Sequence, residues 1–471
     1  MSDLMQQTCE GSMNMPTNTV GNSTDINLDI VKNMDRVKLS DSSDGLELYC
    51  YTHCVADDPD ILKKCRGIVF DGEKVILNAF PYTEEVTAPF FSSDDPNYIP
   101  DFSEIIEKLG DLNQYTFYEA HEGAVIRVFH HKGVWYTSTH RKLNAEKSKW
   151  ASKESFGQMF KDALTAEELE NTAFSSRIAE GEMSDGTTDI ISRFCKSLET
   201  EKQYMFLVRN NSGNRIVCDA ASRPTVFHVG TFVDGELRMD IDVGIPYPKK
   251  YTVSDINDLG DAVYNTNYKE TQGLIAFGPN NTQIKIFNPS YSELFDARGN
   301  EPSINFRYLQ VRMDQRKVDM LYHLYPNSIK DFEEYENRLY EIAKNINKAY
   351  VFRYIKRKHV TIPKEEYEVM KGCHAWHCTD RQSNRVNLTK IIELMNERTP
   401  TNLNRMLKHL KDGSGQPVIS EPKPEFRKQL LEKNKESREN LTEMNSDGRK
   451  SPTIIELNLE ESGEGDAMEI A

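Results

Sequence analysis

Short apolar runs separated by turn residues recur between residues 66 and 288 and predict a succession of β-hairpins. Several turns contain Gly, as at Asp71-Gly72 and Asp234-Gly235, and such pairs between apolar runs are a strong hairpin signal. Residues 202–220 have the same pattern, with the turn expected at 210–214. The predicted hairpins cover 66–80, 115–140, 202–220, 224–239 and 273–288. Strands joined by short turns pair antiparallel, so this part of the chain predicts antiparallel sheets.

The apolar period changes to helical spacing from about residue 311 onward. One of the helices predicted there begins after Pro363 and is expected to end near Gly372, because Pro favours a helix start and Gly a helix end. Shorter helical patterns occur at 102–109 and 153–200. The sequence therefore predicts an α+β fold, with an antiparallel-sheet core followed by an all-helical domain.

The composition of the two ends differs from that of the middle. Both ends are polar and lack periodic apolar residues, which is typical of disordered segments. We therefore expect four parts: a disordered N-terminus at 1–30, the core at 31–310, the helical domain at 311–413, and a charged, mostly disordered tail at 414–471.

The large negative net charge of the chain does not by itself exclude a nucleic-acid partner. The 471 residues include 58 Lys and Arg against 74 Asp and Glu, a formal charge of −16. Residues 1–30 contribute −4 and residues 451–471 contribute −6, which leaves −6 for the remainder. A net negative charge argues against bulk attraction to nucleic acid but allows a local basic surface. No run of 18 apolar residues occurs, so no membrane segment is expected.

The eight cysteines accompany no secretory signal and predict reduced thiols in a cytoplasmic setting. Two groups deserve testing as zinc sites, namely Cys50, His53, Cys54 and Cys65, and the CHAWHC segment at 373–378. Zinc takes four N or S ligands, usually as two spaced pairs. Adjacent Cys-His pairs do not all point the same way on a regular element, so buried core cysteines are the favoured alternative.

A series of segments, in order along the chain, resembles the motifs of covalent nucleotidyltransferases, and in particular of bacteriophage-type RNA ligases. Cys65-Arg66-Gly67-Ile68 resembles the strand before the nucleophile, and 118–143 resembles the nucleophile hairpin and the following strand. Residues 206–217, ending Asn-Arg-Ile-Val, resemble the third motif, while 272–275 and 283–285 occupy the Glu-Gly-x-Val and Lys-x-Lys positions. Such chains with a helical C-terminal module also resemble ligase-like proteins of large cytoplasmic DNA viruses.

The resemblance implies a lysine that attacks ATP or GTP and forms a lysyl-nucleotide, with Mg²⁺. In this sequence Ala120 occupies the nucleophile position, in Ala120-His121-Glu122-Gly123. Gln272 replaces the acidic residue of the fourth motif, and Gln283 replaces the first Lys of the fifth. The nucleotide-binding residues that the resemblance retains or implies are Arg66, Glu122, Gly123, Arg215, Gln272 and Lys285.

Three interpretations follow for function. The first is a catalytically impaired RNA-ligase-like protein that binds nucleotide or RNA ends, or acts as a scaffold, with ATP and Mg²⁺ as the implied cofactors. The second is an active ATP-dependent RNA ligase whose nucleophile is relocated to Lys142 or Lys285. The third is a structural or virion-associated protein of the host cytoplasm or the virion. A plainer interpretation of the retained residues is that Gly123 is a strand glycine, that Glu122 and Lys285 are solvated charges, and that Arg66 makes a salt bridge.

Two basic stretches with aromatic residues are further candidates for RNA contact, at 140–150 and at 350–358. Aromatic rings beside Lys and Arg suit single-stranded nucleic acid, because bases stack while cations hold phosphates. The helices around 314–358 are equally suited to docking a protein partner.

Overall fold

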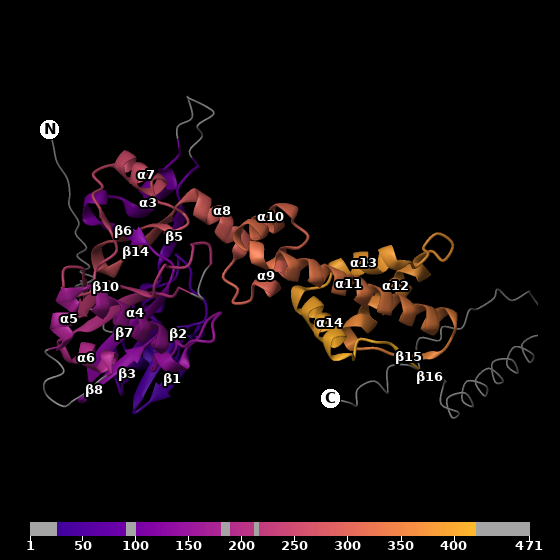
Figure 1. Ribbon diagram of the computed structural model, residues 1–471, viewed down its shortest axis with the longest axis horizontal. Helices are drawn as coiled ribbons and strands as arrows, with labels where there is room; N and C mark the ends of the chain where they lie inside the picture. Colours follow the sequence, from indigo (N-terminus) through magenta and orange to yellow (C-terminus); the bar gives the residue numbers. More distant parts are fainter. Residues whose placement is uncertain (1–25, 91–99, 180–188, 212–215, 421–471) are drawn as a thin grey trace, which may run out of the picture. The chain divides into compact units, whose positions relative to one another are not determined.

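The computed structural model describes residues 26–90, 100–179, 189–211 and 216–420. The chain divides into two compact units, Met1–Ile329 and Lys330–Ala471, and each is considered by itself. The fold is α+β, as the sequence predicted, with antiparallel sheets in the first unit and mainly helices in the second (Figure 1).

The first unit contains three sheets in the described residues. Their strand orders are β1-β2-β3-β4, β11-β10-β9-β7-β8 and β12-β6-β13-β14-β5. All neighbouring strands pair antiparallel except β14 and β5. The strands are β1 (Val37–Ser43), β2 (Leu46–Tyr51), β3 (Arg66–Asp71), β4 (Lys74–Leu77), β5 (Glu84–Thr87), β6 (Thr116–Ala120), β7 (Ala124–His131), β8 (Val134–Ser138), β9 (Gln203–Arg209), β10 (Thr225–Val233), β11 (Glu236–Arg238), β12 (Lys250–Tyr251), β13 (Gly273–Phe277) and β14 (Gln283–Phe287).

Helices cover these sheets on defined faces. The helices of this unit are α1 (Leu28–Lys32), α2 (Asp60–Lys64), α3 (Ser103–Leu109), α4 (Phe156–Glu170), α5 (Thr172–Ala179), α6 (Ile190–Lys196), α7 (Ile256–Tyr264), α8 (Pro289–Arg298), α9 (Ile304–Val311) and α10 (Gln315–Leu324). Helices α4 to α6 cover the five-stranded sheet that contains β9, where the Phe160 and Phe206 rings lie 5.5 Å apart. Helices α3 and α7 cover the sheet that contains β14, through Leu259 and Val263 (Figure 1).

The alternation along β14 decides which residues are available for chemistry. Ile284 and Ile286 point into the core beneath α3 and α7. Successive strand residues point to opposite faces, so Gln283 and Lys285 lie on the other face of the sheet. In the register of the sheet, Lys285 is paired with Glu85 of β5 on one side and with Ile275 of β13 on the other.

Four of the five predicted hairpins are confirmed, and the fifth is wrong. The turns at Asp71-Gly72 and Asp234-Gly235 connect β3 to β4 and β10 to β11. Residues 216–220, the predicted second arm of the 202–220 hairpin, form no strand. The backbone N–H groups of 216–218 donate instead to a buried carboxylate, so they are unavailable to a neighbouring strand.

The predicted boundary at 310/311 differs from the division of the structure at 329/330. Helix α10 belongs to the first unit, where Leu324 packs with Val217 and Tyr291. The Tyr325 hydroxyl donates to the Ile216 carbonyl over 2.6 Å. These contacts attach α10 and Tyr325 to the core of the first unit, whereas periodicity alone assigned them to a separate helical module.

The second unit contains α11 (Ile329–Tyr350), a π-helical turn (Val351–Ile355), β15 (His359–Thr361), α12 (Lys364–Thr379), α13 (Leu388–Asn396), α14 (Pro400–Asp412) and β16 (Val418–Ser420). Strands β15 and β16 pair antiparallel, so this region is not purely helical as predicted. Helix α12 continues past Gly372, where the sequence predicted its end. A Cβ at Gly372 would meet only side-chain atoms at 3.5 and 3.7 Å, so α13 packs closely over this position.

The expected disorder of the two ends is tested only in part, since most of both ends lies outside the described residues. Helix α1 begins at Leu28, inside the stretch predicted to be disordered, and buries Leu28 and Val31. Strand β16 likewise lies inside the predicted tail. No helix in the described part of the chain is long and apolar enough to cross a membrane.

His228 makes the first unit sensitive to acid. Its side chain is fully buried, and burial lowers its pKa to about 4. Because the folded pKa is below that of an unfolded histidine, stability present above about pH 6.5 is lost as the pH falls towards 4. As the pH falls from 7 to 5, we expect the backbone amides of β9 and β10 to lose protection against hydrogen exchange, after correction for the intrinsic pH dependence of exchange. His228→Gln should flatten this change, whereas substitution of the exposed His53 should leave it intact.

Candidate functional site

The segment at the nucleophile position and the segment at the Glu-Gly-x-Val position lie side by side, at the end of β6 and the start of β13. Ala120 is the last residue of β6, is buried, and is paired with Gly273 in the sheet. The backbone N–H of Gln272 donates to the backbone carbonyl of Ala120 over 2.7 Å. Gly273 has a φ of +130°, and an added Cβ would lie 2.2 Å from the Ile286 carbonyl oxygen. Only glycine fits there, because both the backbone conformation and the space exclude a side chain.

Glu122 follows β6 and is a buried carboxylate whose oxygens are fully engaged. Oε1 accepts from the Val217 amide at 2.7 Å, from the Cys218 amide at 3.2 Å and from the Tyr291 hydroxyl at 2.9 Å. Oε2 accepts from the Ile216 amide at 2.9 Å. A carboxylate has about four acceptor positions, so these four bonds occupy most of its capacity. Glu122 is therefore neither a solvated charge nor an open ligand, and we assign it a structural role.

Gln272 and Tyr291 extend this buried network. The Gln272 amide group donates to the Tyr291 hydroxyl over 2.7 Å, and that hydroxyl donates to Glu122. Burial, followed by the nearby Glu122 charge, raises the pKa of Tyr291, which stays protonated as a donor. The network links the residue just before β13, helix α8 and the β6–β7 connection. Sequence spacing gave no signal for Tyr291.

His121 is held in a way that argues against a catalytic substitution for the missing lysine. Its ring stacks on Phe227, with centroids 4.7 Å apart and planes 4° apart. Nδ1 lies 3.2 Å from the Glu270 carbonyl oxygen, and Nε2 lies 3.3 Å from the Glu119 carboxylate. Nδ1 also lies 3.5 Å from Arg209 Nη1, so both ring nitrogens already have partners. Hydrogen bonds from His121 and Tyr251 lower the pKa of Glu119 against the opposing effect of burial.

Arg66 begins β3 and reaches the β5–β14 region. Its guanidinium donates to the Thr83 hydroxyl at 2.9 Å and to the Pro81 carbonyl at 3.3 Å. The Thr83 hydroxyl in turn donates to Gln283 Oε1 at 3.3 Å. Gln283 is only 3% exposed, and its Nε2 has no hydrogen-bond partner. A buried amide donor without an acceptor is costly, so this position calls for an oxygen-rich ligand or water.

Lys285 lies two residues beyond Gln283 on the same sheet face. Desolvation lowers its pKa, the nearby charge of Arg66 lowers it further, and Glu85 and Glu122 oppose the change. Lys285 Nζ lies 3.4 Å from a Glu85 carboxylate oxygen and 5.4 Å from the centre of the Phe287 ring. Its side chain keeps 20% of its surface exposed, so a solvent-borne anion has access to it.

More positive charge gathers on the other side of Arg66. Arg127 is 2% exposed, donates to the carbonyls of Gly67 and Thr139, and has no carboxylate partner in the described residues. Burial lowers the pKa of Arg127 to about 9, which leaves it charged at neutral pH. Desolvation, together with Arg66, Arg127 and Arg141, lowers the pKa of His140 to about 4. We call Arg66, Arg127, His140, Arg141 and Lys285 the basic cluster.

The basic cluster fits phosphate better than it fits Mg²⁺. The Arg66 guanidinium and the Lys285 ammonium of the cluster, with the neighbouring Gln283 amide, are donors that suit an anion. Mg²⁺ prefers carboxylate and other hard oxygen ligands. Among the described residues at motif positions, Glu122 already accepts four hydrogen bonds and position 272 carries an uncharged amide. These residues offer the metal no free carboxylate.

The remaining expected residues are placed as follows. Arg215 lies outside the described residues. Gly123 follows Glu122 at the start of the β7 hairpin, and an added Cβ would lie 2.6 Å from the Val208 carbonyl oxygen. Lys142 Nζ lies 3.5 Å from Asp41 of β1. Two cavities, of about 520 and 320 Å³, lie around the β1–β2 turn and β8 and are not lined by the basic cluster.

Neither predicted cysteine group brings three potential metal ligands together in the described part of the chain. Cys50, Cys54 and Cys65 are buried, and burial raises the pKa of each thiol. The CHAWHC segment lies within α12, with Cys373 buried and Cys378 exposed. The interpretation as core cysteines and half-buried histidines is consistent with this placement.

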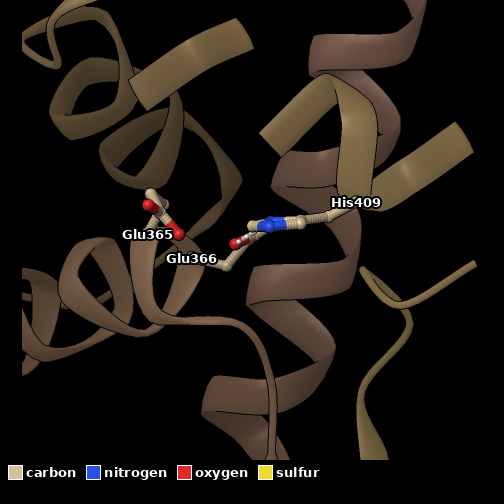
Figure 2. Close-up of side chains that lie close together, drawn as sticks. All are labelled: Glu365, Glu366 and His409. Carbon is tan, nitrogen blue, oxygen red and sulfur yellow. Dashed lines mark hydrogen bonds and ion pairs between the residues drawn. The ribbon is translucent and has the colours of Figure 1, made fainter. Parts of the chain in front are cut away.

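A different group, Glu365, Glu366 and His409, does converge in the second unit (Figure 2). His409 of α14 lies 3.1 and 3.2 Å from the two carboxylate oxygens of Glu366, which is buried at the start of α12. Glu365 is already paired with Arg405 at 3.1 Å. Because a guanidinium neutralises one carboxylate and the histidine contacts the other, we interpret this group as an ion-paired brace between α12 and α14.

The chain is similar to viral proteins named as immediate-early proteins. It is 27% identical over 390 residues to the immediate-early protein ICP-46 homolog of Invertebrate iridescent virus 6, covering 77% of this chain and 80% of the relative. It is 30% identical over 292 residues to the homolog from Invertebrate iridescent virus 3, covering 59% and 57%. It is 22% identical over 285 residues to ICP-46 of Frog virus 3 (isolate Goorha), covering 58% and 64%. No family model matches the chain.

Solved structures similar to the chain are ATP-dependent ligases. A putative ATP-dependent DNA ligase from Aquifex aeolicus matches with a TM-score of 0.36 and 11% identity, covering 80% of this chain and 96% of the ligase. One form of an archaeal ATP-dependent RNA ligase matches with a TM-score of 0.37 and 13% identity, covering 82% and 95%. The chain is thus similar in sequence to viral ICP-46 proteins, and the solved structures that match it, at low TM-scores, are ATP-dependent DNA and RNA ligases.

Proposed function

We propose that the first unit is a catalytically impaired, RNA-ligase-like nucleotidyltransferase that binds a nucleotide or a 5′-phosphorylated RNA end without forming a covalent intermediate. The observation that carries the proposal is the unpartnered, buried Gln283 amide beside Arg66 and Lys285. Three donors around one position suit a phosphate group, whose oxygens are acceptors. ATP is the nucleotide we expect, in the cytoplasm of an infected cell.

The loss of covalent chemistry follows from the nucleophile position. Ala120 has no amine and is buried, and its neighbour His121 is stacked and bonded at both nitrogens. A covalent mechanism that loses its nucleophile loses its intermediate, since remaining groups only bind and orient. The carboxylate of Glu122 supports the same view, because four hydrogen bonds already occupy most of its acceptor capacity.

The experiment incubates the full-length protein with α-labelled ATP or GTP and Mg²⁺, followed by a denaturing gel and, in parallel, equilibrium dialysis. We expect saturable binding in dialysis and no labelled band, with an active ATP-dependent RNA ligase as the positive control. Absence of binding both to ATP and to 5′-phosphorylated RNA at low salt would overturn the proposal in favour of a structural or virion-associated role, because phosphate contacts are strongest at low salt.

A relocated nucleophile is the second candidate, and one observation favours it. Desolvation and Arg66 lower the pKa of Lys285, and a lysine beside another cation is the usual way to obtain a reactive amine. Lys142 has no comparable support, since it pairs with Asp41. A labelled band that disappears in Lys285→Ala and persists in Lys142→Ala would establish this candidate and exclude the noncovalent one.

A further inference from the structure

The strongest run of positive charge in the second unit lies where α11 ends. Residues 342–364 contain seven Lys and Arg and no Asp or Glu. These cations are Lys344, Lys348, Arg353, Lys356, Arg357, Lys358 and Lys364. An acidic protein with such a run has a locally positive surface in spite of its net charge, because fields from exposed charges are screened beyond about 8–10 Å.

The backbone departs from regular helix at this point. Helix α11 leads into a π-helical turn at Val351–Ile355, and Arg357 has a φ of +54°. A left-handed conformation is uncommon for a residue with a Cβ, because the Cβ approaches the following carbonyl oxygen. The Lys356 amide donates to the Val351 carbonyl and the Lys358 amide to the Phe352 carbonyl, both at 2.9 Å. Strand β15 then pairs with β16 and fixes the end of the turn.

In the described part of the chain, this geometry displays exposed cations. Lys356 and Arg357 are exposed, and Arg353 is half-buried between the Tyr354 and Tyr367 rings. None of these three makes an ion pair with an acidic group in the described residues. Lys344, which lies earlier on α11, pairs by contrast with Glu341 at 2.8 Å. The turn thus carries positive charge that is free to meet an external anion.

Apolar surface accompanies the charge. Ile355 is 66% exposed, and Phe352 is half-buried with Lys356 Nζ 4.3 Å from its ring centre. Phosphates spaced along a backbone need several cations, and unpaired bases need flat or aliphatic groups to pack against. A single exposed aliphatic side chain anchors a protein only weakly in a bilayer, because membrane affinity scales with the apolar area that is buried.

We propose that the turn formed by residues 352–357, here called the 352–357 surface, binds single-stranded nucleic acid. Lys356 and Arg357 hold backbone phosphates, while Ile355 and Phe352 pack against unpaired bases. The proposal rests on the second unit alone and is independent of nucleotide binding by the first.

The test measures binding of the full-length protein to a fluorescein-labelled 20-nucleotide oligouridylate across a salt series. We expect the double variant Lys356→Ala/Arg357→Ala to bind about tenfold or more weakly at 50 mM salt. We also expect the slope of log affinity against log salt to fall by about 1.4, since each single-strand phosphate contact contributes about 0.7. Ile355→Ser should weaken binding without changing that slope.

Lys344→Ala is the matched control, because it also removes one cation of the run but one that Glu341 neutralises. It should bind within about twofold of the unmodified protein, by the small energies of exposed ion pairs. Lys142→Ala, a first-unit variant whose lysine pairs with Asp41 at 3.5 Å, should likewise leave oligouridylate binding unchanged. The proposal is overturned if the double variant binds as tightly as the unmodified protein, if Lys344→Ala loses as much, or if duplex RNA or phosphatidylserine vesicles bind more tightly than the single strand.

Discussion

Glu122→Ala is expected to destabilise the first unit by about 3–5 kcal/mol, because three buried backbone N–H groups and one buried tyrosine hydroxyl lose their hydrogen-bond acceptor. Each buried donor left unsatisfied costs about 1–3 kcal/mol, with partial relief where water enters. Urea unfolding monitored by hydrogen exchange at residues 216–218 measures the effect within the first unit. The exposed Glu270→Ala, which is close in sequence to Gln272, should change stability by less than about 0.5 kcal/mol.

Glu122→Gln separates the charge from the hydrogen bonds. One amide oxygen would still accept from Val217, Cys218 and Tyr291, as Oε1 does now. The amide nitrogen would then face the Ile216 N–H, donor against donor. We therefore expect a loss between zero and that of Glu122→Ala. Unchanged stability of Glu122→Ala, or a loss of Mg²⁺-dependent nucleotide binding in Glu122→Gln with stability intact, would show that Glu122 is a ligand rather than a structural clamp.

The hydrogen bonds of Glu122 also explain why one predicted strand did not form although other hairpins were predicted correctly. The hairpins at Asp71-Gly72 and Asp234-Gly235 were predictable, because a local turn and two apolar runs suffice to specify them. The strand expected over 216–220 depended on a partner that local sequence does not reveal. A glutamate nearly 100 residues earlier takes its amides, and only the folded chain brings the two together.

The predicted domain boundary differs from the division of the structure for a related reason. Helical periodicity recognises α10 as a helix but does not say which core its apolar face joins. Leu324 and Tyr325 complete the cluster around Val217 and Tyr291, so the helix belongs to the first unit.

The candidate site was partly accessible from sequence. The order of the motif segments identified Arg66 and Lys285, whose charges lie close enough to shift the Lys285 pKa. The buried Arg127 had no motif to mark it, because an arginine in a strand pattern is usually exposed. The unpartnered amide of Gln283 is a property of its surroundings and has no signature in a single sequence.

Lys285→Ala is expected to weaken noncovalent ATP binding about 10- to 100-fold, which corresponds to the loss of one charge-assisted hydrogen bond of about 1.5–3 kcal/mol. Equilibrium dialysis against labelled ATP measures this directly. Lys285→Arg should recover part of the affinity, since a guanidinium also donates to phosphate. Lys142→Ala is the matched control, because Lys142 pairs with Asp41 and is expected to change affinity less than about twofold.

Glu85→Gln is expected to change ATP affinity in the opposite direction. Glu85 lies 3.4 Å from Lys285 and competes with an incoming phosphate for the ammonium. Removing its charge should strengthen ATP binding, while the same substitution in the Lys285→Ala background should have little effect. Equal gains in both backgrounds would mean that Glu85 acts by general repulsion and that Lys285 does not contact the phosphate.

The pH dependence gives an independent check on the same residue. Desolvation and Arg66 lower the pKa of Lys285, so the ammonium loses its proton at a lower pH than an ordinary lysine. ATP affinity should therefore decline as the pH rises through that lowered pKa, and Lys285→Arg should remove the decline because arginine stays protonated. Arg66→Ala should move the decline to higher pH, since it removes a neighbouring positive charge that disfavours the ammonium. A decline that stays in place in both variants would belong to another group and would remove Lys285 from the proposed phosphate site.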